Sequence, residues 1–158
     1  MAAIIGFNSH FSDSSVVLPQ CTLEMKLRTF HGHIAYQQDD GRIFGFLPDP
    51  LPDIVDTHTV YTGRYYDQTH LFASLKNKIR VDRYEFSTTW HEEAYSYIRL
   101  QGNECSRYCM YSPIHGPPYN CISFIREVVG LGDLPNTNYI GLLFDELKLR
   151  KGFIVGEK

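Results

Sequence analysis

The chain has 158 residues, of which 43% are apolar and 14% aromatic, and this is enough to build one hydrophobic core. Such a composition excludes a disordered or fibrous protein. The net charge is −3 and no basic stripe is present, which argues against nucleic acid as a partner.

The sequence contains no apolar run of the roughly 20 residues that a helix needs to cross a bilayer. The N-terminus lacks the positively charged region of a Sec signal peptide. We therefore expect a single domain over residues 1–158 without a membrane span, in which residues 1–20 form a loose lead-in.

The first half of the chain predicts mainly strands. Residues 22–30 alternate apolar and polar side chains, which is typical of a half-buried strand. The runs 31–38 and 42–47 flank Asp40-Gly41 and predict a β-hairpin, because glycine tolerates the positive φ of a tight turn. Residues 48–74 are rich first in proline and then in tyrosine and threonine, which predicts a long loop with short strands.

The middle of the chain predicts one strand and two helices. Residues 77–86 again alternate apolar and polar side chains. Thr89 and Glu92 form a capping box for a helix that begins at Trp90. Residues 121–129 carry apolar side chains at helical spacing, and a glycine directly after them favours a helix end there.

The C-terminal part predicts a short helix over 140–149 and a terminal strand over 153–155. Strands come first and helices are few, which favours the α+β class. We expect an antiparallel sheet packed against the helix that begins at residue 121.

The four cysteines do not form a recognisable metal motif. Cys105 and Cys109 are four residues apart, whereas zinc pairs are more often spaced CxxC and need two further ligands. A buried or disulfide-forming pair is the better interpretation. His31 and His33 would share one face of a strand, but no third ligand has a recognisable spacing. The sequence therefore predicts neither a metal site nor a cofactor.

Cys121 and His33 are the candidate catalytic residues. A cysteine in the first turn of a helix lies near the positive end of the helix dipole, which favours the thiolate, and near N–H groups that can hold an oxyanion. A histidine far away in sequence can take the thiol proton, as in thiol proteases. The alternative for each residue is structural: a small buried cysteine and a hydrogen-bonded core histidine.

Two short motifs resemble those of the NlpC-type cysteine peptidases, which are papain-like. The sequence HIAY at 33–36, followed by Asp40-Gly41, is similar to the family's strand and hairpin, HxGIY…DG. The sequence NCISFI at 120–125 is similar to its helix start, NCxxF[VI]. His33 precedes Cys121 here, an order that resembles the circularly permuted branch with the lecithin:retinol acyltransferase-like enzymes and various bacterial amidases. The resemblance covers roughly residues 21–130 and implies a permuted papain-like fold.

One position departs from that family. Its third polar residue, which orients the imidazole, usually lies twelve residues after the histidine, and that position is Gly45 here. If Asp40-Gly41 is a two-residue turn, His33 lies opposite Pro48, and Asp49 is the nearest carboxylate. We take Asp49 as the candidate third catalytic residue, with a Cys-His dyad served by a backbone or water partner as the alternative.

The resemblance implies a cysteine amidase or peptidase that works through a covalent acyl-thioester. In that family role Cys121 is the nucleophile and His33 the base. Bacterial relatives often cut peptide amides of peptidoglycan, and some small ones are toxins that a secretion machine delivers to rival cells. The expected partners are a peptide or peptidoglycan substrate and a cognate immunity protein, and the expected destination is the periplasm of a target cell.

Two other functions remain open from the sequence. A lipid or protein acyltransferase or thioesterase would use the same cysteine and histidine, although the retinol acyltransferase-like members usually carry a membrane anchor. A non-catalytic binding module would keep Cys121 as a buried helix residue. Thiol reactivity separates the module from the enzymes, and product analysis separates peptide from lipid substrates.

Overall fold

The computed structural model describes residues 2–7, 32–52, 55–75, 80–86, 106–131, 134–150 and 153–154. Three sequence predictions therefore lie outside the described residues: the strand over 22–30, the helix beginning at Trp90, and the position of Cys105.

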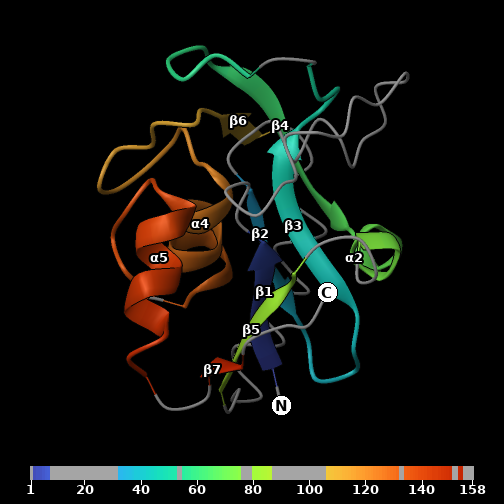
Figure 1. The fold of residues 1–158 in the computed structure, drawn as a ribbon. Coiled ribbons are helices and arrows are strands. Elements are labelled where there is room, and N and C mark those ends of the chain that lie inside the picture. The colour runs from blue at the N-terminus through green and yellow to red at the C-terminus, as the bar shows by residue number, and fades with distance from the viewer. Residues whose placement is uncertain are drawn as a thin grey trace, which may run out of the picture.

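The centre of the structure is a seven-stranded sheet in the order β6-β4-β3-β2-β1-β5-β7 (Figure 1). All six neighbouring pairs are antiparallel. The strands are β1 (Ala2–Phe7), β2 (His33–Gln37), β3 (Ile43–Pro48), β4 (Tyr61–Asp67), β5 (Asp82–Phe86), β6 (Ser106–Tyr108) and β7 (Phe153–Ile154). With its helices, this sheet confirms the expected α+β class.

Helices cover both faces of the sheet (Figure 1). They are α2 (Thr69–Leu75), α4 (Cys121–Ser123), its π-helical continuation η2 (Phe124–Val129), and α5 (Ile140–Leu147). The helix expected over 121–129 is confirmed, and Gly130 ends it with φ 104°. None of the helices in the described ranges is long and apolar enough to cross a membrane.

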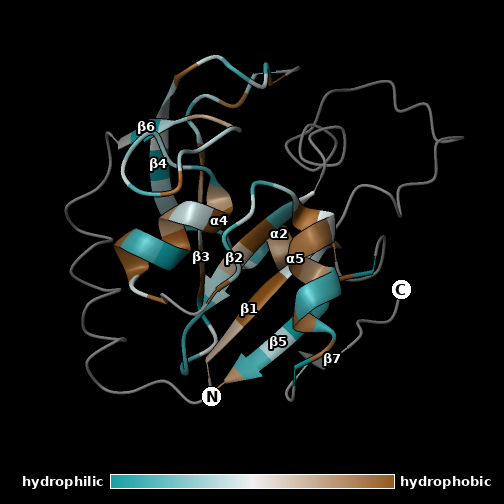
Figure 2. Cartoon of the chain, turned by 90° about the vertical axis from the view of Figure 1, so that its left-hand side faces the viewer, coloured by the Kyte–Doolittle hydropathy of each residue, from teal (hydrophilic) through white to brown (hydrophobic). Residues whose placement is uncertain are grey.

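Residues 2–7 form a central strand, which corrects this part of the expected loose lead-in, whereas residues 8–20 lie outside the described residues. β1 pairs with β2 on one side and β5 on the other, and its residues are almost all buried. Figure 2 shows β1 as hydrophobic beside a mostly hydrophilic β5. Two alanines and a glycine make the sequence AAIIGF a poor match to an alternating pattern, yet a strand buried on both faces needs no alternation.

The hairpin between β2 and β3 is confirmed, but its register differs from the prediction by one residue. The Gln38 N–H donates to the Arg42 carbonyl (2.9 Å), and Tyr36 lies opposite Phe44. The loop therefore has three residues and ends with Gly41 at φ 93°, a turn followed by a left-handed glycine. The predicted opposition of His33 and Pro48 is wrong, because it assumed a two-residue turn.

The region 48–74 is more ordered than the loop with short strands that we expected. It contains the seven-residue strand β4 and, directly after it, the helix α2. Leu71, Phe72 and Leu75 of α2 are buried. This helix was not predicted because only two turns of apolar spacing are available in the sequence.

The two faces of the sheet have different packing partners. Phe124 of η2 stacks on Phe46 (ring centroids 4.2 Å apart) and on Tyr65 (4.9 Å). On the opposite face, Phe72 of α2 packs against Phe7 (6.2 Å) and His33 (6.0 Å). The Cys121 helix and the His33 ring thus belong to opposite faces.

Phe124→Ala is expected to lower the free energy of unfolding by about 3–5 kcal/mol, because Phe124 is fully buried and stacks on two rings. Chemical denaturation measures the change. Leu142→Ala, at a side chain that is 57% exposed, is the control and should change stability by less than about 0.5 kcal/mol. Equal effects in the two variants would contradict this packing.

Candidate active site

Cys121 is held at the first turn of its helix by a complete cap. Asn120 Oδ1 accepts hydrogen bonds from the N–H groups of Ile122 (3.0 Å) and Ser123 (2.8 Å). In return, Ser123 Oγ accepts from the Asn120 N–H (2.9 Å). This reciprocal capping box fixes the backbone on both sides of Cys121.

The Cys121 thiol is protonated at neutral pH, which corrects the expected thiolate. Burial raises its pKa to about 11, and the backbone N–H groups of Ile34, Cys121 and Ile122 lower it by less. The side chain is 4% exposed. Loss of hydration therefore outweighs the helix terminus in this closed site.

The sulfur of Cys121 lies against the start of β2, where β2 and β3 separate. Because Gln38 donates to Arg42, alternation directs the Ile34 N–H toward β3 as well. The β2–β3 register, however, extends only to Tyr36 opposite Phe44. Beyond that pair the Ile34 N–H interacts with the Cys121 sulfur. Cys121 thus lies beside Ile34, the residue that follows His33.

His33 is fully buried, and its ring lies between aromatic side chains. Phe7 packs edge-on at 6.5 Å and Phe72 lies at 6.0 Å, measured between ring centroids. Burial lowers the pKa of His33 to about 4, although a hydrogen bond to Gln68 acts in the opposite direction. The imidazole is therefore neutral at pH 7, as a general base must be.

Gln68 determines which nitrogen of His33 carries the proton. Gln68 Oε1 lies 2.7 Å from His33 Nε2, and both groups are buried. A carbonyl oxygen can only accept a hydrogen bond, so Nε2 is the donor and Nδ1 of the neutral ring has a free lone pair. Nδ1 is buried and has no hydrogen-bond partner among the described residues. It makes no hydrogen bond to Cys121, which approaches from the other face of the sheet.

Gly45 is the reason that Gln68 fits beside the imidazole. A Cβ at Gly45 would collide with Gln68 Oε1 and would lie 2.9 Å from His33 Nε2. Gln68 itself is fixed by two backbone hydrogen bonds, to the Ile43 carbonyl (2.7 Å) and from the Phe72 N–H (3.1 Å). The side chain missing at Gly45 is thus replaced by one from the β4–α2 junction.

Asp49, the expected third catalytic residue, does not contact the imidazole. It lies at the surface, with Arg64 as its ion-pair partner at 3.7 Å. The hydrogen bond that orients His33 comes from Gln68 instead. The expectation for Asp49 depends on a two-residue turn, so the wrong register and the wrong position of Asp49 have the same cause.

Sequence reasoning also missed Tyr108, a buried neighbour of the thiols. Burial raises its pKa well above the usual value, and the nearby ionisable groups of Cys121, Cys109 and Tyr61 raise it further. Cys109 is a free buried thiol, and its sulfur lies 3.6 Å from the Thr57 carbonyl. Within the described residues, no three His, Cys, Asp or Glu side chains gather as a metal site.

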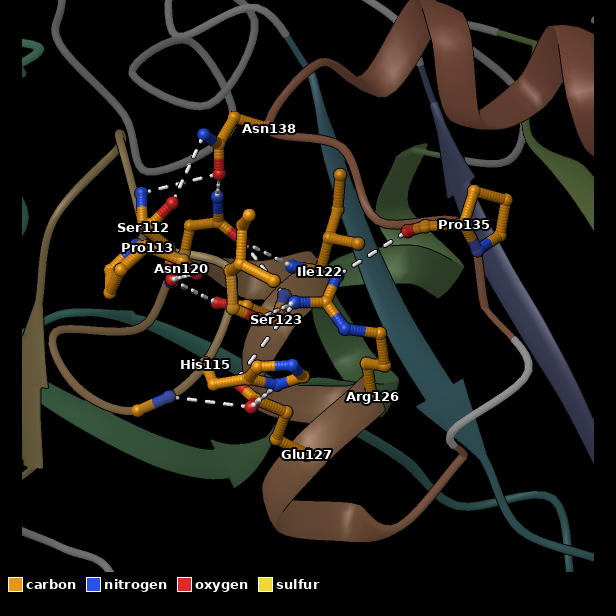
Figure 3. A network of polar contacts seen from close by, with 12 residues as sticks. Ser112, Pro113, His115, Asn120, Ile122, Ser123, Arg126, Glu127, Pro135 and Asn138 are labelled. Atoms are coloured by element: carbon orange, nitrogen blue, oxygen red, sulfur yellow. Dashed lines mark hydrogen bonds and ion pairs between the residues drawn. The ribbon is translucent and has the colours of Figure 1, made fainter.

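Asn138 ties two loops to the Asn120 cap (Figure 3). Its Oδ1 accepts from Asn120 Nδ2 (2.8 Å) and from the Ser112 N–H (3.2 Å), and its Nδ2 donates to the Ser112 carbonyl (3.2 Å). Ser112 Oγ also receives the Ser123 hydroxyl proton (2.8 Å). The cap of the Cys121 helix is therefore part of a larger polar network.

A buried arginine holds the same loops further along the helix. Arg126 donates to the carbonyls of Ile114 (3.1 Å) and Pro135 (3.4 Å). The neighbouring Glu127 accepts from the Gly116 N–H (3.3 Å) and pairs with His115 (3.0 Å), as Figure 3 shows. His115 is exposed.

Asn138→Ala is expected to lower the free energy of unfolding by about 1–3 kcal/mol, because it leaves polar groups of Ser112 and Asn120 without partners. Thermal and urea unfolding measure the loss. The control is Asn136→Ala, at an exposed position of the same loop, which should leave stability nearly unchanged. Equal stability of the two variants would remove Asn138 from this role.

Burial of His33 makes folding stability depend on pH below neutrality. Its pKa is about 4 in the folded protein against 6.5 ordinarily, so between these values the unfolded chain binds more protons. We expect the free energy of unfolding to decrease by up to about 3 kcal/mol as the pH falls from 6.5 to 4. Urea unfolding at several pH values, compared with His33→Gln, measures this contribution. The same pH slope in both proteins would contradict it.

Comparison of the chain with family models, with characterised proteins and with solved structures found no match. The functional interpretation of the site therefore rests on its geometry and on the two sequence motifs.

Proposed function

We propose that the protein is a cysteine hydrolase that cleaves amide bonds through an acyl-thioester on Cys121. The observation that carries the proposal is the state of His33. Gln68 holds Nε2, and Nδ1 has no hydrogen-bond partner among the described residues, at the strand end where Cys121 lies. A structural histidine in a closed core would be expected to use both nitrogens.

The burial of both groups favours a mechanism that starts from neutral partners. As Cys121 Sγ attacks the substrate carbonyl carbon, its proton moves to His33 Nδ1. The first N–H of the helix, that of Cys121, donates to the developing oxyanion. His33 then protonates the leaving amine as the thioester forms. Water, deprotonated by His33, hydrolyses the thioester and restores the thiol.

The proposed mechanism requires the two faces of the site to come together. Cys121 reaches β2 from the α4 side, whereas the His33 ring packs on the α2 side. Catalytic hydrogen bonds are often long before substrate binds and shorten in the complex. The mechanism therefore requires a rearrangement at the start of β2, where its pairing with β3 has already ended, that brings Nδ1 to the sulfur.

Acylation by p-nitrophenyl acetate tests the proposal. Intact-mass and peptide mass spectrometry should find one acetyl group per chain, on Cys121, formed with a burst of nitrophenol. His33→Ala should remove the burst, whereas Cys109→Ala, at the other buried thiol of the described residues, should keep it. The proposal would be contradicted if no adduct formed, if both cysteines were labelled equally, or if His33→Ala left the burst unchanged. Cys121 would then be a core residue of a binding module.

The substrate part of the proposal depends on the family resemblance. We propose peptide amides of bacterial peptidoglycan as the substrate, and delivery as a toxin to the periplasm of a target cell opposed by an immunity protein. Digestion of purified muropeptides should yield new amino termini with the wild-type chain and none with Cys121→Ala. Expression directed to a bacterial periplasm should cause lysis; harmlessness there would contradict the toxin role, and release of fatty acids from lipids would favour the acyltransferase alternative.

A further inference from the structure

Three aromatic side chains from separate loops meet at the surface beside the Cys121 helix. We call His58, Tyr111 and Tyr139 the aromatic patch. His58 packs edge-on against the Tyr111 ring at 5.0 Å, and the Tyr111 and Tyr139 rings lie 6.1 Å apart. The two tyrosine hydroxyls are joined by a hydrogen bond of 3.1 Å. The patch is thus a cluster of nearly perpendicular rings, in which the two tyrosines are also joined through their hydroxyl groups.

The aromatic patch is exposed although each ring has apolar surface to bury. Tyr111 is 37% exposed and Tyr139 is 54% exposed, and His58 is also exposed. Further exposed apolar side chains lie two or three residues along the chain from its members: Val60, Ile114 and Leu142. Exposed aromatic side chains that contact one another, as those of the patch do, mark a binding surface more often than scattered ones do.

The loops that carry the aromatic patch are held rigidly to each other. The Tyr111 N–H donates to the Thr57 carbonyl (3.3 Å), which joins the loop of Tyr111 to that of His58. Asn138, directly before Tyr139, makes two hydrogen bonds to Ser112, directly after Tyr111. A surface that is already ordered loses little entropy on binding a ligand.

The same contacts connect the loops of the aromatic patch to the cap of the Cys121 helix. Asn138 accepts a hydrogen bond from Asn120, the residue before Cys121. Tyr111 and Tyr139 are therefore each one residue from a group that belongs to the Cys121 cap network (Figure 3). A ligand on the patch would lie beside the end of the helix at which substrate is attacked.

We infer that the aromatic patch binds a neutral sugar ring of the substrate. The rings offer flat faces for the C–H surface of a pyranose, and the tyrosine hydroxyls at their edges can both donate and accept hydrogen bonds. The three side chains of the patch include no lysine or arginine, and the Asp56 carboxylate, which accepts a hydrogen bond from the His58 N–H (3.0 Å), disfavours an anion beside them. A purely apolar ligand would cover hydroxyl groups without replacing their hydrogen bonds to water.

This inference rests on the proposed function only for the role of the sugar: the scissile amide would belong to a peptide that is attached to it. Binding itself can be measured without catalysis. The experiment uses the full chain with Cys121→Ala and titrates it calorimetrically with N-acetylglucosamine trimer, with N-acetylphenylalanine amide as the comparison ligand.

The expected result is saturable binding of the trimer that weakens about tenfold or more in Tyr111→Ala and Tyr139→Ala. Leu149→Ala, at a leucine that is 88% exposed and outside the patch, is the matched control and should bind as the parent does. Tyr139→Phe keeps the ring and removes the hydroxyl, so its affinity for the trimer should lie between that of the parent and that of Tyr139→Ala. Absent binding, binding indifferent to both tyrosines, or tyrosine-dependent binding of the phenylalanine amide alone would overturn the inference.

Acylation of Cys121 by p-nitrophenyl acetate distinguishes failure of this inference from failure of the proposed function. The small ester does not need the patch, so Tyr139→Ala with Cys121 intact should still be acylated at the wild-type rate. Loss of sugar binding with normal acylation locates the defect in the patch alone.

Discussion

Cys121→Ala is expected to reduce amide hydrolysis by about four orders of magnitude or more, because it removes the sulfur that we propose forms the thioester. The structure should be retained. Cys121 is a small buried side chain, and the Asn120 cap uses backbone and side-chain groups of Ile122 and Ser123 instead of the thiol. Initial rates on a muropeptide, together with a thermal melt, measure both parts of the prediction.

Two controls separate a chemical effect from a structural one. Cys109→Ala changes the other buried free thiol of the described residues and should retain full activity. Cys121→Ser keeps the size of the side chain but has a far less acidic hydroxyl in a site that already raises the pKa of the thiol, so it too should be nearly inactive. Substantial hydrolysis by Cys121→Ala would remove this residue from catalysis.

The position of Cys121 could be read from the sequence because all its determinants are local. Asn120 and Ser123 are cap residues at the correct spacing, and the apolar run 121–129 with a following glycine defines the helix. His33 could be placed at a strand start for a similar reason. The Asp40-Gly41 dipeptide indicates a hairpin, whatever the length of its loop.

The third residue of the site could not be read from the sequence. Gln68 lies 35 residues after His33, in a stretch whose strand and helix had no clear pattern. Its contact with His33 depends on the pairing of β3 with β4, which places Tyr66 opposite Gly45 and Gln68 just beyond. Gly45 was the available signal: a missing side chain beside a histidine indicates that another segment fills the space.

The protonation states were also outside what the sequence could predict. The position of Cys121 at a helix start predicts a thiolate, and the backbone N–H groups there do lower the pKa of Cys121. Burial has the larger effect, and burial depends on the packing of α4 against β2, which sequence spacing does not contain. The N-terminal strand β1 was missed for a related reason, since a strand buried on both faces has no alternation to detect.

Gln68→Ala is expected to slow hydrolysis by about 10- to 100-fold with the fold retained, because the Nε2–H of His33 loses its acceptor and both tautomers become available. Nitrogen NMR of His33 provides a readout that a purely structural role would not change. In the wild-type protein Nε2 should carry the proton, and in the variant the Nδ1–H form should gain population.

Gly45→Ala tests the same contact from the other strand. The new Cβ would collide with Gln68 Oε1 and lie 2.9 Å from His33 Nε2, so we expect a loss of activity similar to that of Gln68→Ala and a lower melting temperature. Gly63→Ala is a matched control, because its Cβ would also meet a side chain, that of Phe46, away from the imidazole. It should lower stability and leave the His33 tautomer unchanged.

The double variant Gly45→Asn with Gln68→Ala tests whether any hydrogen-bond acceptor for the Nε2–H of His33 is sufficient, or whether the acceptor must be Gln68. Removing the Gln68 side chain frees the space that the introduced asparagine requires, and the new amide oxygen would start from the strand position nearest to Nε2. We expect the pair to be more active than either single variant, with the Nε2–H tautomer restored. Additive losses would mean that His33 is not oriented by a side-chain acceptor, and that the Gln68 hydrogen bond only stabilises the core.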